Sequence, residues 1–407
     1  MIPLADAQAA VLAPVEPLPP VRVALADAHG LVLAEEVVAP EPVPPFANTA
    51  VDGYAVRASD TASAPVRLRV VGELPAGAAP GRAVGAGEAI RIMTGAPVPP
   101  GADAVVMVEV TDAHGDEVVV HESVAPGANV RDAGGDLEAG ARVFGPGTVL
   151  TPAHVGVLAS LDRHEVVCHP RPRVGVLSTG DELVERGPLA PGKIRDSNRP
   201  MLRAVLAEAG CEVADYGIAP DDEHEIERRI ARAVDECDLL LTSGAVSVGD
   251  YDYVKVVLER LAARRPGSGH RWVQVAIKPA KPLAFAHVGR VPVIGLPGNP
   301  VSSRVAFELF ARPVLRRLAG HGDAGVLPVP VRAVARSGFR RRPDGKLHLD
   351  RVRVSVEGGR LVCERAGVQA SNVLSGMAAA NGLALVPDGE GVDAGDEVEV
   401  LLLGPPA

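Results

Sequence analysis

Residues 171–183 read RPRVGVLSTGDEL, in which a short apolar strand, Arg173–Leu177, runs directly into a loop of hydroxyl, glycine and acidic residues. Segments typical of helices and of strands then alternate as far as Leu318. The expected helices are Met201–Ala209, Ile226–Val234, Val254–Leu261 and Val305–Leu318, and the expected strands are Glu212–Ile218, Asp238–Thr242, Trp272–Ile277 and Val291–Ile294. Such alternation predicts a central, mainly parallel α/β sheet covered by helices on both faces.

The rest of the 407-residue chain has a different character, which predicts several domains. Short strand-like runs separated by turn residues predict an inserted, mainly β domain over 46–140, with strands at Val66–Val71, Ala89–Met93, Ala104–Val110 and Glu117–His121. The flanking segments 1–45 and 141–170 are expected to pair into one discontinuous linker domain around it. The α/β domain is expected to cover 171–322. Strand-like runs return over 323–407 and predict a C-terminal β barrel, with strands at Val329–Val334, Leu347–Val356, Leu361–Arg365, Gly382–Pro387 and Glu397–Leu403.

Composition narrows the class of protein. The formal net charge is −10, so the chain lacks the basic footprint of a nucleic-acid-binding protein. The four cysteines are far apart and form no CxxC pair, which disfavours metal cages and disulfides and indicates a reducing, cytoplasmic setting. The N-terminus does not resemble a signal peptide, and no apolar run is as long as a membrane-spanning helix, so no membrane partner is expected.

Loops at the expected carboxyl ends of strands carry the residues suited to binding or catalysis, and ligands bind α/β sheets at this edge. Glycines let backbone N–H groups approach an anion, and hydroxyls add donors. The alternative is that these are ordinary turns and helix caps. Four loops are selected, at 178–182, 242–252, 278–282 and 295–303. The candidate binding residues in the first, second and fourth loops are Thr179, Gly180, Asp181, Ser243, Gly244, Ser247, Gly249, Pro297, Gly298, Asn299 and Ser302.

The third loop, KPAKP, holds Lys278 and Lys281 three residues apart between stiffening prolines. Two rigidly held lysines beside glycine loops predict a clamp for phosphate or an oxyanion. Carboxylates beside an anion repel it unless a cation lies between them, and Mg²⁺ is the usual solution. Glu182, Asp250 and Asp252 are therefore candidate metal ligands. Alternatively, these acids only offset the positive ends of helices.

Two further motifs complete a family resemblance. Residues 48–55 (NTAVDGYA) and 91–99 (RIMTGAPVP), followed by the loops above in order, resemble the signatures of molybdopterin molybdenumtransferases, the MoeA and gephyrin E-domain family. The resemblance spans nearly the whole chain. It implies an elongated homodimer whose α/β domain is of the molybdopterin-binding type. The implied reaction inserts molybdate into adenylated molybdopterin with release of AMP, assisted by Mg²⁺.

The resemblance also implies roles for individual residues. Glu182 and Asp252 would serve metal binding and adenylate cleavage, while Asp52 and Thr94 would reach in from the partner subunit. Asp221 or Asp222 would help to hold the nucleotide. Lys278, Lys281 and Ser302 would bind molybdate or the neighbouring phosphate, with Arg351 and Ser371 as further substrate contacts. Contacts with the molybdopterin adenylyltransferase and with acceptor molybdoenzymes are expected as well.

Residues 331–360 carry nine Lys or Arg against three acids within this acidic chain. We expect part of this basic segment to cover the anionic substrate of the partner subunit, but we expect Arg340–Arg342 to form only a solvated basic face. Two other functions remain open at this point. One is the adenylyltransferase step, because the α/β domain alone is similar. The other is a non-catalytic scaffold of the gephyrin E-domain type.

Overall fold

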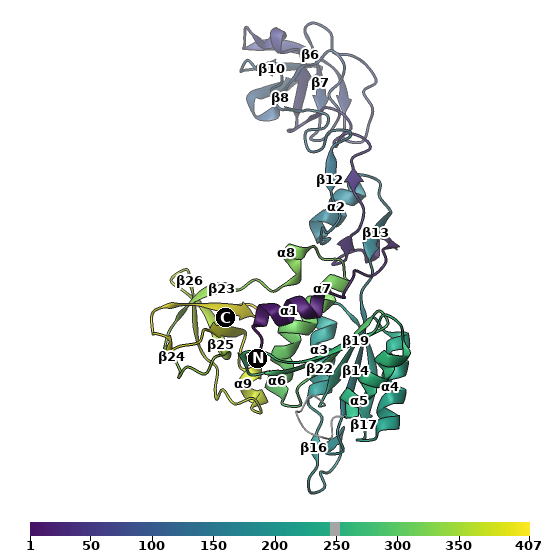
Figure 1. Ribbon diagram of the computed structural model, residues 1–407. Helices are drawn as coiled ribbons and strands as arrows, with labels where there is room; N and C mark the ends of the chain where they lie inside the picture. Colours follow the sequence, from purple (N-terminus) through teal and green to yellow (C-terminus); the bar gives the residue numbers. More distant parts are fainter. Residues whose placement is uncertain (245–252) are drawn as a thin grey trace.

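The computed structural model describes residues 1–244 and 253–407, and in them the chain forms an elongated arrangement of four parts (Figure 1). An inserted β domain lies at one end and is joined by a narrow linker domain to the α/β domain. The C-terminal barrel lies beside the α/β domain at the other end. No helix in the described ranges is both long and apolar enough to cross a membrane.

The α/β domain is built on a sheet with the strand order β17-β14-β18-β22-β21-β19. The first four strands in this order run parallel, whereas β21 is antiparallel to both of its neighbours. The predicted mainly parallel sheet is confirmed, but the sequence analysis missed β21. The strands are β14 (Arg173–Thr179), β17 (Glu212–Ala219), β18 (Leu239–Ser243), β19 (Gly269–Gln274), β21 (Pro282–Val288) and β22 (Val291–Leu296).

Helices cover both faces of this sheet, because its strands are apolar on both sides. Leu239 and Leu241 of β18 pack into one core, and Leu240 packs into the other. The helices over the first core are α1 (Leu4–Leu12), α3 (Asn198–Glu208), α6 (Pro300–Ala306), the π-helix η4 (Phe307–Ala311) and α7 (Arg312–Leu318). Those over the second are α4 (Glu223–Glu236) and α5 (Tyr253–Arg264).

The first helix belongs to the α/β domain, so the prediction that 1–45 lies wholly in the linker domain is wrong at its start. Ala7 and Val11 of α1 are buried in the α/β core, and Figure 1 shows α1 beside α7. The backbone N–H of Ile2 donates to Gln274 O at 2.8 Å, and that of Leu18 donates to Leu318 O at 2.8 Å. The sequence missed this because the contacts span some 300 residues of chain.

The two flanks of the insertion do pair into one linker domain. Strand β1 (Val21–Ala24) runs antiparallel to β13 (Glu165–His169), which also pairs with β2 (Val32–Leu33). Residues Leu33, Leu158 and Val166 share a small core. The remaining elements are η1 (Leu25–Asp27), β3 (Val37–Val38), β12 (Arg142–Phe144) and α2 (Pro152–Ser160).

The inserted domain contains a sheet with the order β8-β5-β7-β6-β10-β9. The predicted strands are present, but the sequence analysis missed β5 and β9. Strand β5 follows directly on Asp52 and lies between β8 and β7. The elements are β4 (Asn48–Thr49), β5 (Gly53–Val56), η2 (Ala58–Thr61), β6 (Val66–Leu74), β7 (Glu88–Ile92), β8 (Ala104–Met107), η3 (Val108–Val110), β9 (Thr111–His114), β10 (Glu117–Val120) and β11 (Val130–Arg131).

The C-terminal strands close into a barrel, as predicted, because β25 pairs with both β26 and β27. A short strand from the α/β domain, β20 (Ile277–Lys278), joins the barrel's sheet by pairing with β25. The barrel strands are β23 (Val331–Ala335), β25 (Leu347–Glu357), β26 (Arg360–Arg365), β27 (Gly382–Val386) and β29 (Glu397–Leu402). The remaining short elements are β15 (Leu183–Val184) and β16 (Ile194–Arg195) of the α/β domain, and α8 (Asp323–Val326), β24 (Phe339–Arg340), α9 (Leu374–Ala378) and β28 (Gly391–Val392) of the C-terminal part.

Candidate active site

The loops that follow β14, β18 and β22 lie at one edge of the sheet, because these neighbouring strands are parallel. The loops after β14 and β18 approach so closely that residue 244 must be a glycine, and the loop after β22 lies in van der Waals contact with them. A Cβ on Gly244, which has a φ of 113°, would lie 2.4 Å from Thr179 O. A Cβ on Gly298 would lie 3.6 Å from the Cα of Gly244. The structure therefore brings together three of the loops that the sequence analysis selected.

A hollow of about 630 Å³ lies over these loops, and we call it the glycine hollow. It contains several of the predicted site residues, and it also contains the polar run Asp196–Asn198, which the sequence analysis missed. Its lining is Glu182, Leu183, Ile194, Arg195, Asp196, Ser197, Asn198, Ser243, Gly244, Pro282, Pro297, Gly298, Asn299, Pro300 and Asn372. The predicted residues Ser247, Gly249, Asp250 and Asp252 lie outside the described residues.

Glu182 is the exposed carboxylate of this hollow, and it folds back over Gly180. A Cβ on Gly180, whose φ is 142°, would lie 2.3 Å from Glu182 Oε2. The glycine thus leaves the space that the carboxylate occupies. Within 1–244 and 253–407, no group of three or more His, Cys, Asp or Glu is arranged to hold a metal ion. Glu182 is a suitable Mg²⁺ ligand by its chemistry, but the predicted set is only partly within the described residues.

Asp221 and Asp222 have different environments, which the sequence could not distinguish. Asp222 is the N-cap of α4 and accepts a hydrogen bond from the N–H of Glu225 at 2.8 Å. Asp221 instead accepts from the backbone N–H of Asp181, and Asp181 accepts from that of Asp221, both at 3.1 Å. Asp222 therefore has a helix-capping role, while Asp221 holds the turn that precedes Glu182.

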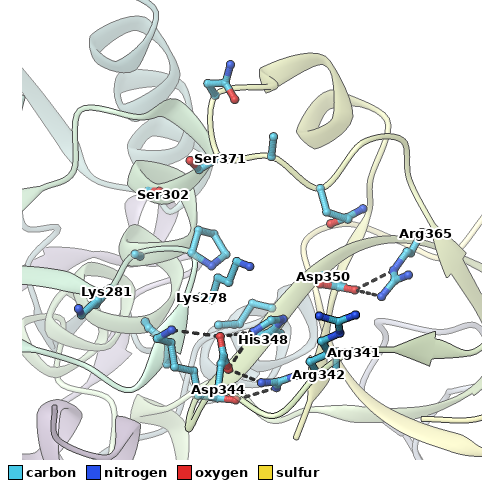
Figure 2. A pocket seen from close by; sticks show the side chains of 18 of the residues that line it. Lys278, Lys281, Ser302, Arg341, Arg342, Asp344, His348, Asp350, Arg365 and Ser371 are labelled. Atoms are coloured by element: carbon cyan, nitrogen blue, oxygen red, sulfur yellow. Dashed lines mark hydrogen bonds and ion pairs between the residues drawn. The ribbon is translucent and has the colours of Figure 1, made fainter. Parts of the chain in front are cut away.

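A second hollow of about 940 Å³, the lysine hollow, lies between the α/β domain and the barrel (Figure 2). It adjoins the glycine hollow, since Pro282 and Asn372 line both. From the α/β domain it is lined by Ile277, Lys278, Pro279, Ala280, Lys281, Pro282 and Ser302. From the barrel it is lined by Arg340, Arg341, Arg342, Pro343, Asp344, Lys346, His348, Leu349, Asp350, Arg365, Gln369, Ala370, Ser371 and Asn372.

The backbone fixes the two lysines of the KPAKP loop at this boundary. Lys278 belongs to β20 and pairs in register with His348 of the barrel. Between the lysines, Ala280 is buried and adopts the left-handed region with a φ of 70°, which is uncommon for a residue other than glycine. Such strained backbone persists only where the surroundings enforce it, and it clusters at functional sites.

Most cations of the lysine hollow are paired with carboxylates. Arg340 pairs with Asp393 at 2.5 Å, Lys346 with Asp344 at 3.0 Å, and Arg365 with Asp350 at 2.8 Å. Over the described part of the chain, no hydrogen bond or ion pair engages the side chains of Lys278, Lys281 or Arg342. These three cations are available to an anion.

The expectation that Arg340–Arg342 form only a solvated basic face is wrong for Arg341, whereas Arg340 and Arg342 are exposed as expected. The side chain of Arg341 is 5% exposed, and its guanidinium binds Asp388 at 2.9 Å and the carbonyl of Lys346 at 2.7 Å. All three arginines line the lysine hollow of their own chain. Arg341 holds the loop that precedes β25, and this loop carries Arg342 into the hollow.

Asp344 organises the barrel side of the lysine hollow, as Figure 2 shows. Desolvation would raise the pKa of this carboxyl, but hydrogen bonds from His348 and Lys346 outweigh it and lower the pKa to about 2. Its separation from His348 Nε2 is 3.1 Å. Asp344 therefore stays ionised and neutralises neighbouring barrel cations, which leaves the positive charge of the hollow concentrated on the unpaired side chains.

Ser371 lines the lysine hollow, but Arg351 does not reach it. Ser371 lines it, and its carbonyl accepts a hydrogen bond from the N–H of Val301 at 3.1 Å. Arg351 is 1% exposed, and its guanidinium donates to the carbonyls of Val368, Ala370 and Val373. The structure places Arg351 behind the loop that carries Ser371, where it positions this loop, in contrast to the predicted direct substrate contact.

Asp52 and Thr94 lie together in the inserted domain. Asp52 Oδ1 accepts hydrogen bonds from both the backbone N–H and the hydroxyl of Thr94, each at 2.7 Å. Figure 1 shows that the inserted domain is separated from the α/β domain of the same chain by the linker domain. These two residues are therefore remote from both hollows within one subunit.

Comparison with known proteins matches this arrangement part by part. Residues 2–161 match the MoeA N-terminal region (domain I and II), 175–317 a probable molybdopterin binding domain, and 332–403 the MoeA C-terminal region (domain IV). A protein of Mycobacterium tuberculosis (strain CDC 1551) named molybdopterin molybdenumtransferase 2 is 41% identical over 387 residues, covering 94% of each chain.

The chain belongs to the MoeA family of molybdopterin molybdenumtransferases. It is accordingly an enzyme of this family. The molybdopterin molybdenumtransferase of Haemophilus influenzae is 38% identical over 387 residues, and the match covers 92% of each chain. The crystal structure of the MoeA protein from Pyrococcus horikoshii covers 99% of this chain and 100% of its own, with a TM-score of 0.82 at 31% identity. The family resemblance inferred from the motifs is thus confirmed over the whole chain.

Proposed function

We propose that this MoeA-family enzyme inserts molybdate into adenylated molybdopterin and releases AMP, the last step of molybdenum cofactor assembly. The observation that carries the proposal is the adjacency of the two hollows. One presents glycine loops and a carboxylate, the other presents unpaired lysines, and Pro282 and Asn372 line both. Two different anions can thus be held side by side.

Molybdate is assigned to the lysine hollow. It is a tetrahedral dianion without an apolar surface, so its recognition depends on cations and hydrogen-bond donors. Lys278 and Lys281 supply fixed charge, and Ser302 and Ser371 line the same space. Holding molybdate there raises its effective concentration beside the dithiolene sulfurs of molybdopterin.

Adenylated molybdopterin is assigned to the glycine hollow. Gly244 and Gly298 have no side chains, which leaves room for a phosphate beside the backbone, and Asn299 and Ser243 add polar groups. Glu182 is the described carboxylate placed to serve the cleavage of the adenylate. A bound Mg²⁺ would neutralise charge on the phosphate oxygens, and Glu182 with Asp250 and Asp252 is its proposed ligand set.

The complete site is proposed to form in a homodimer. Asp52 and Thr94 are held together at one end of the elongated subunit, remote from both hollows of the same chain. Their place in the site therefore requires a second subunit, whose inserted domain would reach the α/β domain of the first.

A single-turnover assay tests the reaction. Purified protein is mixed with adenylated molybdopterin, with and without molybdate, and AMP release is followed. We expect AMP release that depends on molybdate and is lost in Glu182→Gln. Glu212→Gln is the matched control, because Glu212 begins β17 at the opposite edge of the sheet. Consumption of ATP in place of preformed adenylate would instead identify an adenylyltransferase. Cofactor synthesis that survives Glu182→Ala would identify a scaffold.

Subunit complementation tests the dimer. Asp52→Asn and Glu182→Gln would each inactivate the homodimer. Co-expressed with different tags and purified as a heterodimer, the two variants should regain about half of the wild-type activity, since one of the two shared sites is then intact. Two inactive parents and an inactive heterodimer would show that both residues act in the same subunit's site.

A further inference from the structure

Asn198 joins the two loops that form the floor of the glycine hollow. Its Nδ2 donates to Ser243 Oγ at 2.8 Å and to the carbonyl of Gly298 at 2.7 Å. Ser243 ends β18 and Gly298 follows β22, so a single amide group bridges loops from two neighbouring strands. Asn198 is 7% exposed and lines the hollow itself.

The orientation of this amide is fixed by its partners. The carbonyl of Gly298 can only accept, so the group that faces it must be the NH₂ of Asn198. Asn198 Oδ1 then points elsewhere, is buried, and has no hydrogen-bond partner among the described residues. An unpaired buried acceptor costs free energy. Asparagine at this position is therefore poorly explained by stability, and local violations of this kind are typical of functional sites.

An ionic network centred on the buried side chain of the next residue, Arg199, holds Asn198 in place. Arg199, whose side chain is 4% exposed, binds Asp196 at 3.2 Å and Asp215 at 2.6 Å. Arg199 also pairs with Glu185 at 3.2 Å, and Glu185 follows the strand β15 that comes after Glu182. The start of α3 is thereby fixed to β17 and to the segment that carries the carboxylate.

We propose that Asn198 is a positioning residue that selectively serves the adenylated substrate. By tying Ser243 to Gly298 it sets the spacing of the floor on which the adenylate phosphate is held. It does not contact the lysine hollow, whose lining excludes it. The inference rests on the proposed function for the identity of the substrate, but the geometry of the floor can be tested without turnover.

The test measures the two substrates separately. In Asn198→Ala we expect the KM for adenylated molybdopterin to rise about tenfold, because the floor loses the two hydrogen bonds that set its spacing and small misplacements of binding groups are costly. The KM for molybdate should stay within about twofold. Asn198→Asp, which keeps the size but loses the donors and adds a negative charge beside the anion, should raise this KM at least as much as Asn198→Ala does. The double variant with Ser243→Ala should show less than the sum of the two single effects, because both changes remove the same bond.

A matched asparagine separates positioning from general stability. Asn381 in the barrel has both polar atoms paired, since Oδ1 accepts from Val354 N at 2.6 Å and Nδ2 donates to Val354 O at 2.9 Å. Asn381→Ala should lower the Tm and leave both KM values unchanged. Asn198→Ala should change the Tm less than Asn381→Ala does. Equal rises in both KM values, no change in either, or a Tm loss as large as that of Asn381→Ala would overturn the proposal.

AMP serves as the probe that does not depend on turnover. Calorimetric titration of AMP into the wild-type protein and into Asn198→Ala should show about tenfold weaker binding by the variant. If the wild type binds AMP but catalyses no molybdate-dependent release, the proposed function fails while the floor geometry is still tested. If both proteins bind AMP equally, the positioning role of Asn198 is wrong.

Discussion

Thr94 donates two hydrogen bonds to Asp52 Oδ1, one from its backbone N–H and one from its hydroxyl, each 2.7 Å long. The bonds join two sequence motifs that are 42 residues apart. The hydroxyl and backbone bonds from Thr94, with a smaller contribution from Arg91, hold the pKa of Asp52 below its usual range. Hydrogen bonds to a carboxylate favour its ionised form. Asp52 therefore remains negative at pH values where an ordinary aspartate begins to protonate.

Thr94→Val is expected to move the acid limb of the pH profile. The variant removes the hydroxyl bond, so the pKa of Asp52 rises toward its ordinary value and the carboxylate is lost at a higher pH. If catalysis needs ionised Asp52, kcat/KM should fall at a higher pH than in the wild type and be little changed near neutrality. Thr111→Val is the control, because its hydroxyl donates to Val108 O and to no carboxylate among the described residues. Superimposable profiles would show that the hydroxyl does not tune Asp52.

Gly180→Ala should displace Glu182. The added Cβ would lie 2.3 Å from the carboxylate, and the φ of 142° disfavours any side chain. A displacement of about 1 Å of a catalytic group can lower a rate by about 10², so we expect AMP release to slow by roughly this factor. Gly187→Ala has a comparable backbone strain (φ 96°), but no atom of residues 1–244 and 253–407 lies within 4 Å of the new Cβ, and it should retain activity. Equal losses in both variants would point to strain alone.

Lys278→Ala is expected to weaken molybdate binding. Removing one of the three unpaired cations that line the hollow should raise the KM for molybdate about tenfold or more, since charge-assisted contacts exceed neutral ones. The effect should shrink as ionic strength increases. Lys255→Ala provides the control, because Lys255 lies on α5 over the ring of Trp272. The assignment of molybdate to this hollow would be wrong if both variants kept the wild-type KM.

Local patterns in the sequence were sufficient to predict the main elements. The barrel strands at 347–357 and 360–365 were expected almost to the residue, because apolar residues and turn glycines delimit them clearly. Strand β5 was missed, because four residues beside the turn at Asp52 and Gly53 carry too short a pattern. Strand β21 was missed although it is apolar, because it follows directly on the proline-rich lysine loop.

The site itself was predictable only in its loops. The motifs identified Lys278 and Glu182, but the partners of each side chain depend on tertiary packing. The burial of Arg351 behind the Ser371 loop and the pairing of β20 with the barrel are examples. Asn198 was missed because the helical pattern of apolar residues begins only at Met201, whereas α3 starts at Asn198.

The placement of α1 in the α/β core leads to a prediction about stability. Val11 is 2% exposed there, so Val11→Ala should destabilise this domain by about 2 kcal/mol through lost burial and a residual cavity. Trp272, the single tryptophan, lies in β19 of the same domain and reports its unfolding by urea. Val329→Ala, at a residue that is 77% exposed, should have almost no effect. An unchanged transition for Val11→Ala would mean that α1 contributes nothing to the core.

Arg342 and Arg340 both line the lysine hollow, but only Arg340 has carboxylate partners among the described residues. The guanidinium of Arg340 is held by Glu390 and Asp393, which do not line the hollow, whereas no described carboxylate holds that of Arg342. Arg342→Ala is therefore expected to raise the KM for molybdate by about threefold at low salt, a typical size for an exposed charge. Arg340→Ala should shift this KM less, because Glu390 and Asp393, the carboxylates that it leaves unneutralised, do not line the lysine hollow. Steady-state kinetics at two ionic strengths decide between them, and a larger effect for Arg340→Ala would show that the paired cation is the one that attracts the anion.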